Sequence, residues 1–335
     1  MIWRGKNGPL LIAEIGGNHE GSFTYAKRLL NLSCLSNIDV IKYQIYQGDT
    51  LVNKKLSPNR YKHFKNFELT KKQHLYLADL CKERGFMYLS SVWNKNDLRW
   101  VEKKMNFFKI GSGDLTAYDQ IYETCKYKKP ILLSTGLSTF SEIKETLDFI
   151  KTTDKFYKNK KNIALLQCTS SYPTKNEEIN LNAVKTLKKL GYEIGYSHHG
   201  KNQFPLELAY TLGCNILEFH FTDTRKNKKF RDHKISLTPK MVNNLIKKIK
   251  LINTYLGSDK KKPTREEIES DNIHTFRRSL YLNKDIKKNS IIRKEDLVSL
   301  RPAKSLSAKY FFKIINKKAK KNLNKLEKIS LKDFK

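Results

Sequence analysis

The sequence predicts an α/β protein, a (β/α)8 TIM barrel followed by a small C-terminal β-rich domain. Eight short apolar runs recur up to residue 220, and amphipathic segments with a helical period lie between them. Alternating strands and helices are typical of a parallel sheet, and eight such units close into a barrel. A change of pattern after residue 257 predicts the second domain.

The eight runs are the expected strands. They cover residues 10–15, 40–43, 86–91, 107–110, 131–134, 163–168, 193–197 and 216–220. Expected helices include residues 23–35, 71–84, 141–151, 181–190, 206–212 and 239–255. Each strand ends in polar or ionisable residues just before a turn. Because barrel enzymes build their active sites at the carboxyl ends of the strands, this pattern predicts an enzyme.

Three segments are expected along the chain. Residues 1–257 form the barrel, and residues 258–272, charged and poor in apolar side chains, read as a linker. Residues 273–335 contain short apolar runs at 279–282, 290–292, 297–300 and 313–315, which indicate a β-rich domain. A domain of about 60 residues has a modest core, so we expect it to dock on the barrel or on a second subunit.

The charge of the chain is strongly positive. Of 335 residues, 66 are Lys or Arg and 33 are Asp or Glu, which gives a formal net charge of +33. The excess comes mostly from lysine, which fits solvated outer helix faces better than a phosphate-reading groove, so no nucleic-acid partner is expected. The same field would draw small anions towards the barrel mouth.

Cysteine usage and hydropathy predict a cytoplasmic protein. The five cysteines are scattered without a C-x-x-C pair, and all but Cys168 fall in helical patterns, which is typical of buried thiols in a reduced protein. We expect no signal peptide and no membrane association, because no apolar run approaches the roughly 20 residues of a membrane span.

Two histidines follow neighbouring expected strands. His199 comes after the seventh strand and His220 ends the eighth. Their imidazoles could share a divalent metal and leave positions open for water and substrate. The alternative is one hydrogen-bonded core histidine and one loop histidine. Two nitrogen ligands completed by oxygen favour Mn²⁺ or Mg²⁺ over a closed zinc site.

Two lysines lie inside apolar strands. An unpaired ammonium is costly to bury, so Lys42 and Lys109 need a carboxylate, a phosphate or a carbonyl beside them. Hydroxyls at three neighbouring strand ends come from Ser91, Ser112 and Ser134. Together they predict a nest for a small phosphorylated, carboxylated anion. Two alternatives remain: a Schiff base on one lysine, or internal pairing with Glu14, Asp114 or Glu218.

Carboxylates near the strand ends are the candidate acids and bases. Glu14 ends the first strand and Glu218 lies in the eighth, so either could move a proton or orient the lysines and histidines. Asp232 follows the eighth strand in a loop and is a candidate for binding sugar hydroxyls.

Six segments, in chain order, resemble the sialic acid synthase family. They are residues 13–21 (AEIGGNHEG), 42–44 (KYQ), 108–114 (FKIGSGD), 133–136 (LSTG), 167–173 (QCTSSYP) and 218–223 (EFHFTD). Residues 276–281 (FRRSLY) and 300–302 (LRP) resemble the C-terminal antifreeze-like (SAF) domain of that family. The resemblance covers nearly the whole chain, and the ordered set of motifs is specific.

The resemblance implies a transferase of sialic acid biosynthesis. An N-acetylneuraminate synthase-like enzyme condenses phosphoenolpyruvate with an N-acylated mannosamine-type sugar to a nonulosonic acid and releases phosphate by C–O cleavage. The implied metal, Mn²⁺ or Mg²⁺, is held by His199 and His220. The implied phosphoenolpyruvate site consists of Lys42, Lys109, Ser91, Ser112, Ser134, Ser170 and Ser197.

The resemblance also implies the sugar contacts and the assembly. These contacts come from Gln44, Tyr172 and Asp232. Arg301 corresponds to an arginine that in this family reaches the active site of the other subunit, so a domain-swapped homodimer is expected. We hypothesise that Glu14 manages the proton of the water that adds to C2.

Four positions depart from the pattern of the family. They are His198, Ser170, Ser91 and Ala303, where aspartate, asparagine, threonine and glycine are usual. Because His198 directly precedes His199, either imidazole could bind the metal. Alanine in place of glycine would make the loop that presents Arg301 less free to turn.

Two other functions stay open at this point. A metal-dependent barrel aldolase or hydrolase could use the same histidines on another sugar substrate. A non-catalytic protein that binds polyanions or glycans could use the +33 charge, and it predicts basic residues gathered on one outer face. The sequence also leaves the acceptor open between N-acetylmannosamine and its dideoxy, diacetamido relative.

Overall fold

The computed structural model describes residues 2–335, which form two compact units. The first ends at Gly257 and the second is Ser258–Lys335. Each unit has its own cluster of buried apolar side chains.

The first unit is a closed barrel of eight parallel strands. They are β2 (Gly8–Glu14), β3 (Val40–Ile45), β4 (Met87–Val92), β5 (Phe108–Ile110), β6 (Ile131–Ser134), β7 (Ile163–Gln167), β8 (Glu193–His198) and β9 (Ile216–His220). Each strand pairs with the next, and β2 also pairs with β9. The predicted barrel is therefore confirmed. A short β1 (Arg4–Gly5), which we did not predict, pairs antiparallel with β2.

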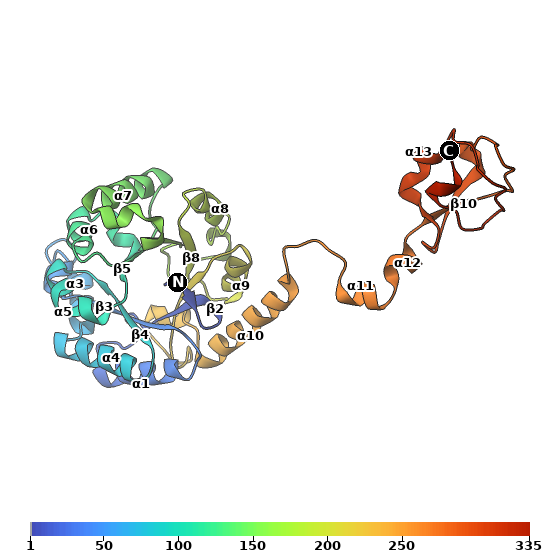
Figure 1. Ribbon diagram of the computed structural model, residues 1–335. Helices are drawn as coiled ribbons and strands as arrows, with labels where there is room; N and C mark the ends of the chain where they lie inside the picture. The colour runs from blue at the N-terminus through green and yellow to red at the C-terminus, as the bar shows by residue number, and fades with distance from the viewer. Residues whose placement is uncertain (1) are drawn as a thin grey trace. The chain divides into compact units, whose positions relative to one another are not determined.

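Helices surround these strands, as Figure 1 shows. They are α1 (Phe23–Cys34), α4 (Lys71–Glu83), α5 (Lys95–Val101), α6 (Tyr118–Cys125), α7 (Phe140–Thr153), α8 (Ala183–Lys188), α9 (Phe204–Thr211) and α10 (Pro239–Leu256). Capping boxes begin α4 and α7, since Thr70 and Thr139 accept a backbone N–H three residues on while Gln73 and Glu142 bond back. Two further helices, α2 (Gly48–Leu51) and α3 (Pro58–Phe67), lie between β3 and α4.

The strands explain where the core sits. Residues 10–13 of β2 are completely buried, because helices cover the outside of a parallel barrel and side chains fill its inside. Some buried strand residues are polar, and several of these are ionisable, among them Glu14, Lys42 and Lys109 near the strand ends. These positions are where a function has to be sought.

The second unit is built on a small antiparallel sheet. Strand β10 (Ser279–Leu282) lies between β11 (Leu297–Leu300) and β12 (Leu306–Ser307). The strand expected at 313–315 is wrong: most of it lies in helix α13 (Phe311–Ile314). Residues 290–292 contribute only an isolated bridge from Ile291 to Lys318.

The stretch expected to be a linker contains helical turns. It holds α11 (Arg265–Glu269) and the start of α12 (Asn272–Phe276). A capping box between Thr264 and Glu267 begins α11 although its residues are exposed. This capping box was overlooked in the sequence because the charged composition of the segment indicated a linker.

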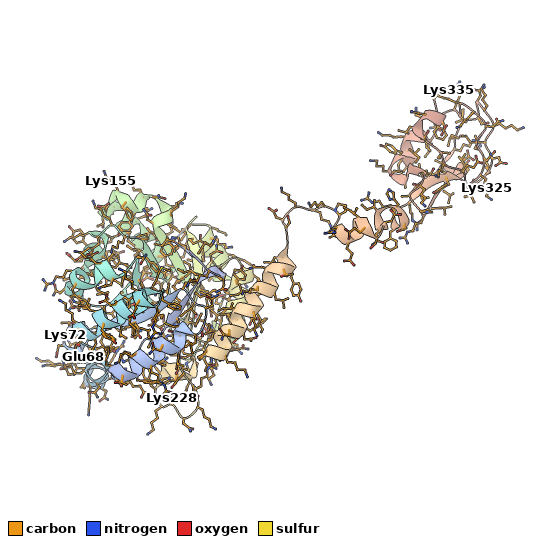
Figure 2. All side chains as sticks on the ribbon, turned by 60° about the horizontal axis from the view of Figure 1, so that its bottom comes forward. Glu68, Lys72, Lys155, Lys228, Lys325 and Lys335 are labelled. Carbon is orange, nitrogen blue, oxygen red and sulfur yellow. The ribbon has the colours of Figure 1, made fainter. Side chains whose placement is uncertain are left out.

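The cysteines are unpaired, and surface lysines are spread over the barrel unit. All five cysteines are free, and Cys214 lies between α9 and β9 rather than in a helix. Lysine side chains such as Lys72, Lys155 and Lys228 extend from different sides of the barrel unit in Figure 2, unlike the single basic face that a polyanion-binding protein predicts. Among residues 2–335, no helix is both long enough and apolar enough to cross a membrane.

Candidate active site

The parallel register gathers the predicted residues at one end of the barrel. Glu14 of β2 lies opposite Lys42 of β3 and His220 of β9. Ser91 of β4 lies opposite Lys109 of β5. Ser91 also pairs with Gln44, two residues beyond Lys42, so these pairings bring side chains from five strands towards the same end of the barrel.

The two strand lysines meet two carboxylates. Lys42 Nζ lies 2.6 Å from Glu14 Oε2 and 3.8 Å from Glu218 Oε2. Lys109 Nζ lies 3.6 Å from Glu218 Oε1 and donates to Ser134 Oγ at 2.6 Å. All four charged side chains are buried. The structure thus shows internal pairing with Glu14 and Glu218, and in its described part no ion pair joins either lysine to Asp114.

The pKa values of the four groups differ because their surroundings differ. Burial raises the pKa of Glu14 to about 7, although Lys42 acts against it. Burial also opposes the charge on Glu218, but Lys109 and Lys42 outweigh it and hold that pKa well below its usual value. The pKa of Lys42 is raised, since its two carboxylates outweigh burial, whereas burial lowers that of Lys109. When Glu14 takes a proton, two ammonium groups face a single carboxylate, which suits an anionic ligand.

Hydroxyls from further strands surround this network. Ser197 Oγ donates to Glu218 Oε1 at 2.9 Å. Ser112 Oγ accepts the backbone N–H of Gly136 at 3.1 Å. A Cβ on Gly136 would lie 2.5 Å from Ser170 Oγ and 2.8 Å from Ser112 Oγ, so only glycine lets these hydroxyls converge. The serines predicted for an anion nest therefore lie around the same network. The exception is Ser91, whose hydroxyl makes no hydrogen bond within residues 2–335 that would place it in the nest.

The two predicted histidines form a pair. The ring centroids of His199 and His220 are 5.5 Å apart. Tyr172 contacts both, with centroid distances of 4.4 and 5.8 Å, and its hydroxyl lies 3.3 Å from His199 Nε2. His198 turns elsewhere, since its Nδ1 lies 3.0 Å from the hydroxyl of Tyr196. Of the two adjacent histidines, His199 is the one that faces His220.

The nitrogens of this pair have the properties of metal ligands. Burial lowers the pKa of His199 to about 4 and that of His220 well below its usual value, so both rings are neutral near pH 7. His199 Nδ1 lies 2.8 Å from the carbonyl of Thr169, which as an acceptor fixes the proton on Nδ1 and leaves the lone pair on Nε2. His220 Nδ1 is buried without a hydrogen-bond partner, 3.8 Å from Asp232 Oδ2.

Protein side chains of residues 2–335 do not form a complete cage for a metal. No cluster of three or more His, Cys, Asp or Glu side chains suited to a metal occurs among residues 2–335. Two neutral imidazoles fit an open site in which water or substrate oxygens supply the other ligands.

The predicted sugar-binding residues of the barrel lie beside these groups. Gln44 Nε2 donates to Glu14 Oε1 at 2.7 Å. Asp232 is buried, its Oδ1 lies 3.3 Å from Arg231 Nε, and burial raises its pKa to about 6 although Arg231 acts against this shift. Arg301 belongs to the second unit, where its guanidinium lies 5.8 Å from the ring centroid of Phe276.

The loop that carries Arg301 shows why alanine fits there. Ala303 donates its backbone N–H to the carbonyl of His274 at 2.7 Å. It is not among the residues with positive φ, so the methyl group of Ala303 causes no strain. The expectation that alanine restricts this loop has no support in its backbone conformation.

Sequence reasoning missed several groups at this rim. The guanidinium of Arg231 lies 5.0 Å from the ring centroid of Tyr172. His63 and Phe67 of α3 contact Phe230, which directly precedes Arg231. The only signal was that Arg231 and Phe230 adjoin Asp232; nothing in the periodicity marked α3.

Family models and known proteins match most of the chain. A model of the NeuB family matches residues 29–261, and a model of the SAF domain matches residues 277–335. N,N'-diacetyllegionaminic acid synthase of Campylobacter jejuni is 33% identical over 334 residues, covering 96% of this chain and 98% of the relative. The protein with the same name from Legionella pneumophila is 31% identical over 330 residues, covering 94% and 91%.

A solved structure extends the comparison. N-acetylneuraminic acid synthetase of Leptospira borgpetersenii, in complex with citrate, has a TM-score of 0.71 and 28% identity, and the match covers 79% of this chain and 91% of that one. The family model alone spans more than half of the chain. The chain therefore belongs to the NeuB family, whose curated relatives are synthases of sialic, legionaminic and pseudaminic acids, and it carries a C-terminal SAF domain.

Proposed function

We propose that this protein condenses phosphoenolpyruvate with an N-acylated mannosamine-type sugar to give a nonulosonic acid. The observation that carries the proposal is the convergence of Lys42, Lys109, His199 and His220 at one end of the barrel of a NeuB-family chain. The two lysines suit an anionic ligand, and the two histidines suit a metal cation.

Phosphoenolpyruvate fits the lysines and their hydroxyls. Its phosphate and carboxylate would take the ammonium groups of Lys42 and Lys109, which the structure places on either side of Glu218. Hydroxyls around Gly136, from Ser112 and Ser170, would donate to the phosphate oxygens. Because each of these lysines is already paired with a buried carboxylate, formation of a Schiff base on either one would have to break an ion pair.

We propose that His199 and His220 hold Mn²⁺ or Mg²⁺. The unpartnered Nδ1 of His220 and the fixed tautomer of His199 support this assignment. When bound, such an ion acts as a Lewis acid towards the carbonyl of the open-chain sugar. Asp232, whose Oδ2 lies 3.8 Å from His220 Nδ1, would bind a sugar hydroxyl next to the ion.

The reaction has a simple balance. C3 of the enol forms a bond to the aldehyde carbon of the sugar, whose oxygen takes up a proton. Water then adds to C2, and phosphate leaves with the oxygen that bridged it to C2. We propose that Glu14 takes the proton from this water, because a carboxylate with a pKa raised to about 7 is a competent base near neutral pH. Lys42 and Gln44 hold its two oxygens in place.

The acceptor and the assembly are further parts of the proposal. Two relatives that match over more than nine tenths of this chain are named N,N'-diacetyllegionaminic acid synthase, which supports an acceptor with two acylamino groups. We propose a homodimer in which Arg301 of one copy contributes to the site of the other. Its support is the family resemblance of residues 300–302.

Phosphate release tests the proposal directly. The full chain is mixed with phosphoenolpyruvate, Mn²⁺ and each of a panel of N-acylated hexosamines, and phosphate is measured with and without EDTA. We expect release only with a suitable sugar and only with metal. Lys109→Met should abolish release, whereas Lys95→Met, which removes a surface ammonium paired with Asp119, should not. Absence of sugar-dependent release from the whole panel would contradict the proposal.

A further inference from the structure

A short segment after β7, residues 169–174, holds His199 at two points. His199 Nδ1 donates to the carbonyl of Thr169 at 2.8 Å, and the carbonyl of His199 accepts the backbone N–H of Thr174, also at 2.8 Å. A parallel bridge between Thr174 and Gly200 keeps this segment beside the chain just past His198, where β8 ends. The side chain and the backbone of His199 are therefore fixed by the same segment.

The buried hydroxyl of Thr174 closes this segment on itself. It lies 2.8 Å from the carbonyl of Ser171 and 3.2 Å from that of Thr169, and it shares its single proton between these two acceptors. The hydroxyl of Thr169 donates in turn to the carbonyl of Glu178 at 2.7 Å. The carbonyl that accepts from His199 is thus tethered through its own residue and through Thr174.

The two histidines of the pair differ in this support. Within residues 2–335, Nδ1 of His220 is buried without a hydrogen-bond partner, whereas Nδ1 of His199 has the carbonyl of Thr169. A carbonyl on the far nitrogen of a ligand histidine fixes its tautomer and the orientation of its ring. His199 is therefore the histidine whose lone pair on Nε2 is held in place before any ion binds.

We infer that Thr174 is a positioning residue for the metal ion, because its hydroxyl holds the carbonyl of Thr169 where that carbonyl fixes the ring of His199. This inference rests on the metal site proposed at His199 and His220, and it adds a residue that acts only through its neighbours. Loss of such an outer partner weakens metal binding although both ligands remain. A threonine with a purely structural role would lose stability on the same change but leave metal affinity as it was.

Calorimetric titration of the full chain with Mn²⁺ tests this inference. We expect Thr174→Val, which keeps the size of the side chain but removes its hydroxyl, to weaken Mn²⁺ binding about tenfold. Thr174→Ser keeps the hydroxyl and should bind Mn²⁺ nearly as tightly as the wild type. Thr146→Val is the matched control, because Thr146 is also buried and its hydroxyl also donates to a backbone carbonyl, that of Leu115 at 3.0 Å. Both valine variants should lose stability in thermal unfolding, but only Thr174→Val should lose Mn²⁺ affinity.

A second variant and a second measurement keep the test decisive if Thr174→Val does not fold. Thr169→Val removes the other tether of the same carbonyl and should also weaken Mn²⁺ binding. NMR of the imidazole nitrogens should show His199 of the metal-free wild type with its proton on Nδ1.

The outcomes separate this inference from the proposed function. Wild-type Mn²⁺ affinity in a folded Thr174→Val or Thr169→Val, an equal loss in Thr174→Ser or Thr146→Val, or a wild-type His199 with its proton on Nε2 would overturn the role of Thr174. A wild-type chain that binds no Mn²⁺ would overturn the metal site as well. The condensation itself is judged by the sugar-dependent release of phosphate, which does not depend on any of these variants.

Discussion

Glu218 is the shared partner of both buried lysines, so its removal should destabilise the barrel strongly. In Glu218→Gln, Lys42 still has an ion pair with Glu14 at 2.6 Å. Lys109 loses its carboxylate partner and retains only its hydrogen bond to the hydroxyl of Ser134. Removing one member of a buried ion pair costs about 3–5 kcal/mol. At about 2–4 °C per kcal/mol for a domain of 150–250 residues, the Tm should fall by roughly 6–20 °C.

Thermal unfolding of the full chain measures this change against two controls. Asp119→Asn breaks an exposed ion pair with Lys95 and should cost less than about 1 kcal/mol. Lys109→Met combined with Glu218→Gln removes both charges and should be more stable than Glu218→Gln alone. A Tm loss no larger than that of Asp119→Asn, or no recovery in the double variant, would refute the reasoning.

The dependence of stability on acidic pH tests the same carboxylate independently. The pKa of Glu218 is lowered on folding, so its stabilisation is fully present above its ordinary value of 4.5 and is lost as the pH falls below it. The stability difference between wild type and Glu218→Gln should shrink by about 1.4 kcal/mol per pH unit below pH 4.5. A difference that stays constant between pH 6 and pH 3.5 would show that the lost stability has another origin.

Three further predictions concern the chemistry. His220→Ala should lower the affinity for Mn²⁺ by more than about a hundredfold, measured by calorimetric titration, and an unchanged affinity would exclude His220 as a ligand. The wild-type kcat/KM should rise with pH up to about pH 7, because Glu14 must lose its proton to act as a base, and Glu14→Gln should remove that limb and lower the rate by about 10²–10⁴-fold. Truncation after Gly257 should leave a folded barrel with its own core but little turnover, as should Arg301→Ala in the full chain; full turnover of the truncated protein would contradict the role proposed for Arg301.

Much of the barrel could be predicted because its strands are buried on both faces. The runs at 131–134 and 216–220 coincide with β6 and β9, since each takes its place in a regular alternation of strands and helices. The segment 313–315 failed because a short apolar run fits a helix as well as a strand, and tertiary packing placed most of it in α13. Position at a strand end was therefore a better guide than the apolar run alone.

The candidate site was predictable where one residue per strand end was enough to place it. The choice between His198 and His199 was not, because β8 ends at His198 and the alternation of side chains no longer holds beyond that point. The cluster of His63, Phe67 and Phe230 was also out of reach, because α3 has no buried face and hence no periodic signal. Its contacts join residues more than 160 positions apart, His63 and Phe230, which no local pattern encodes.

The pairing of β2 with β9 has a consequence for how the protein acquires activity. Glu14 and His220, neighbours across this seam, are contributed by the first and the last parallel strand. A nascent or cleaved chain that stops before residue 216 therefore contains both lysines but only one of the two proposed metal ligands, and it can become active only once the barrel is closed. Enzymatic turnover therefore requires a closed barrel. A circular permutant whose new termini lie between two other strands should keep this turnover.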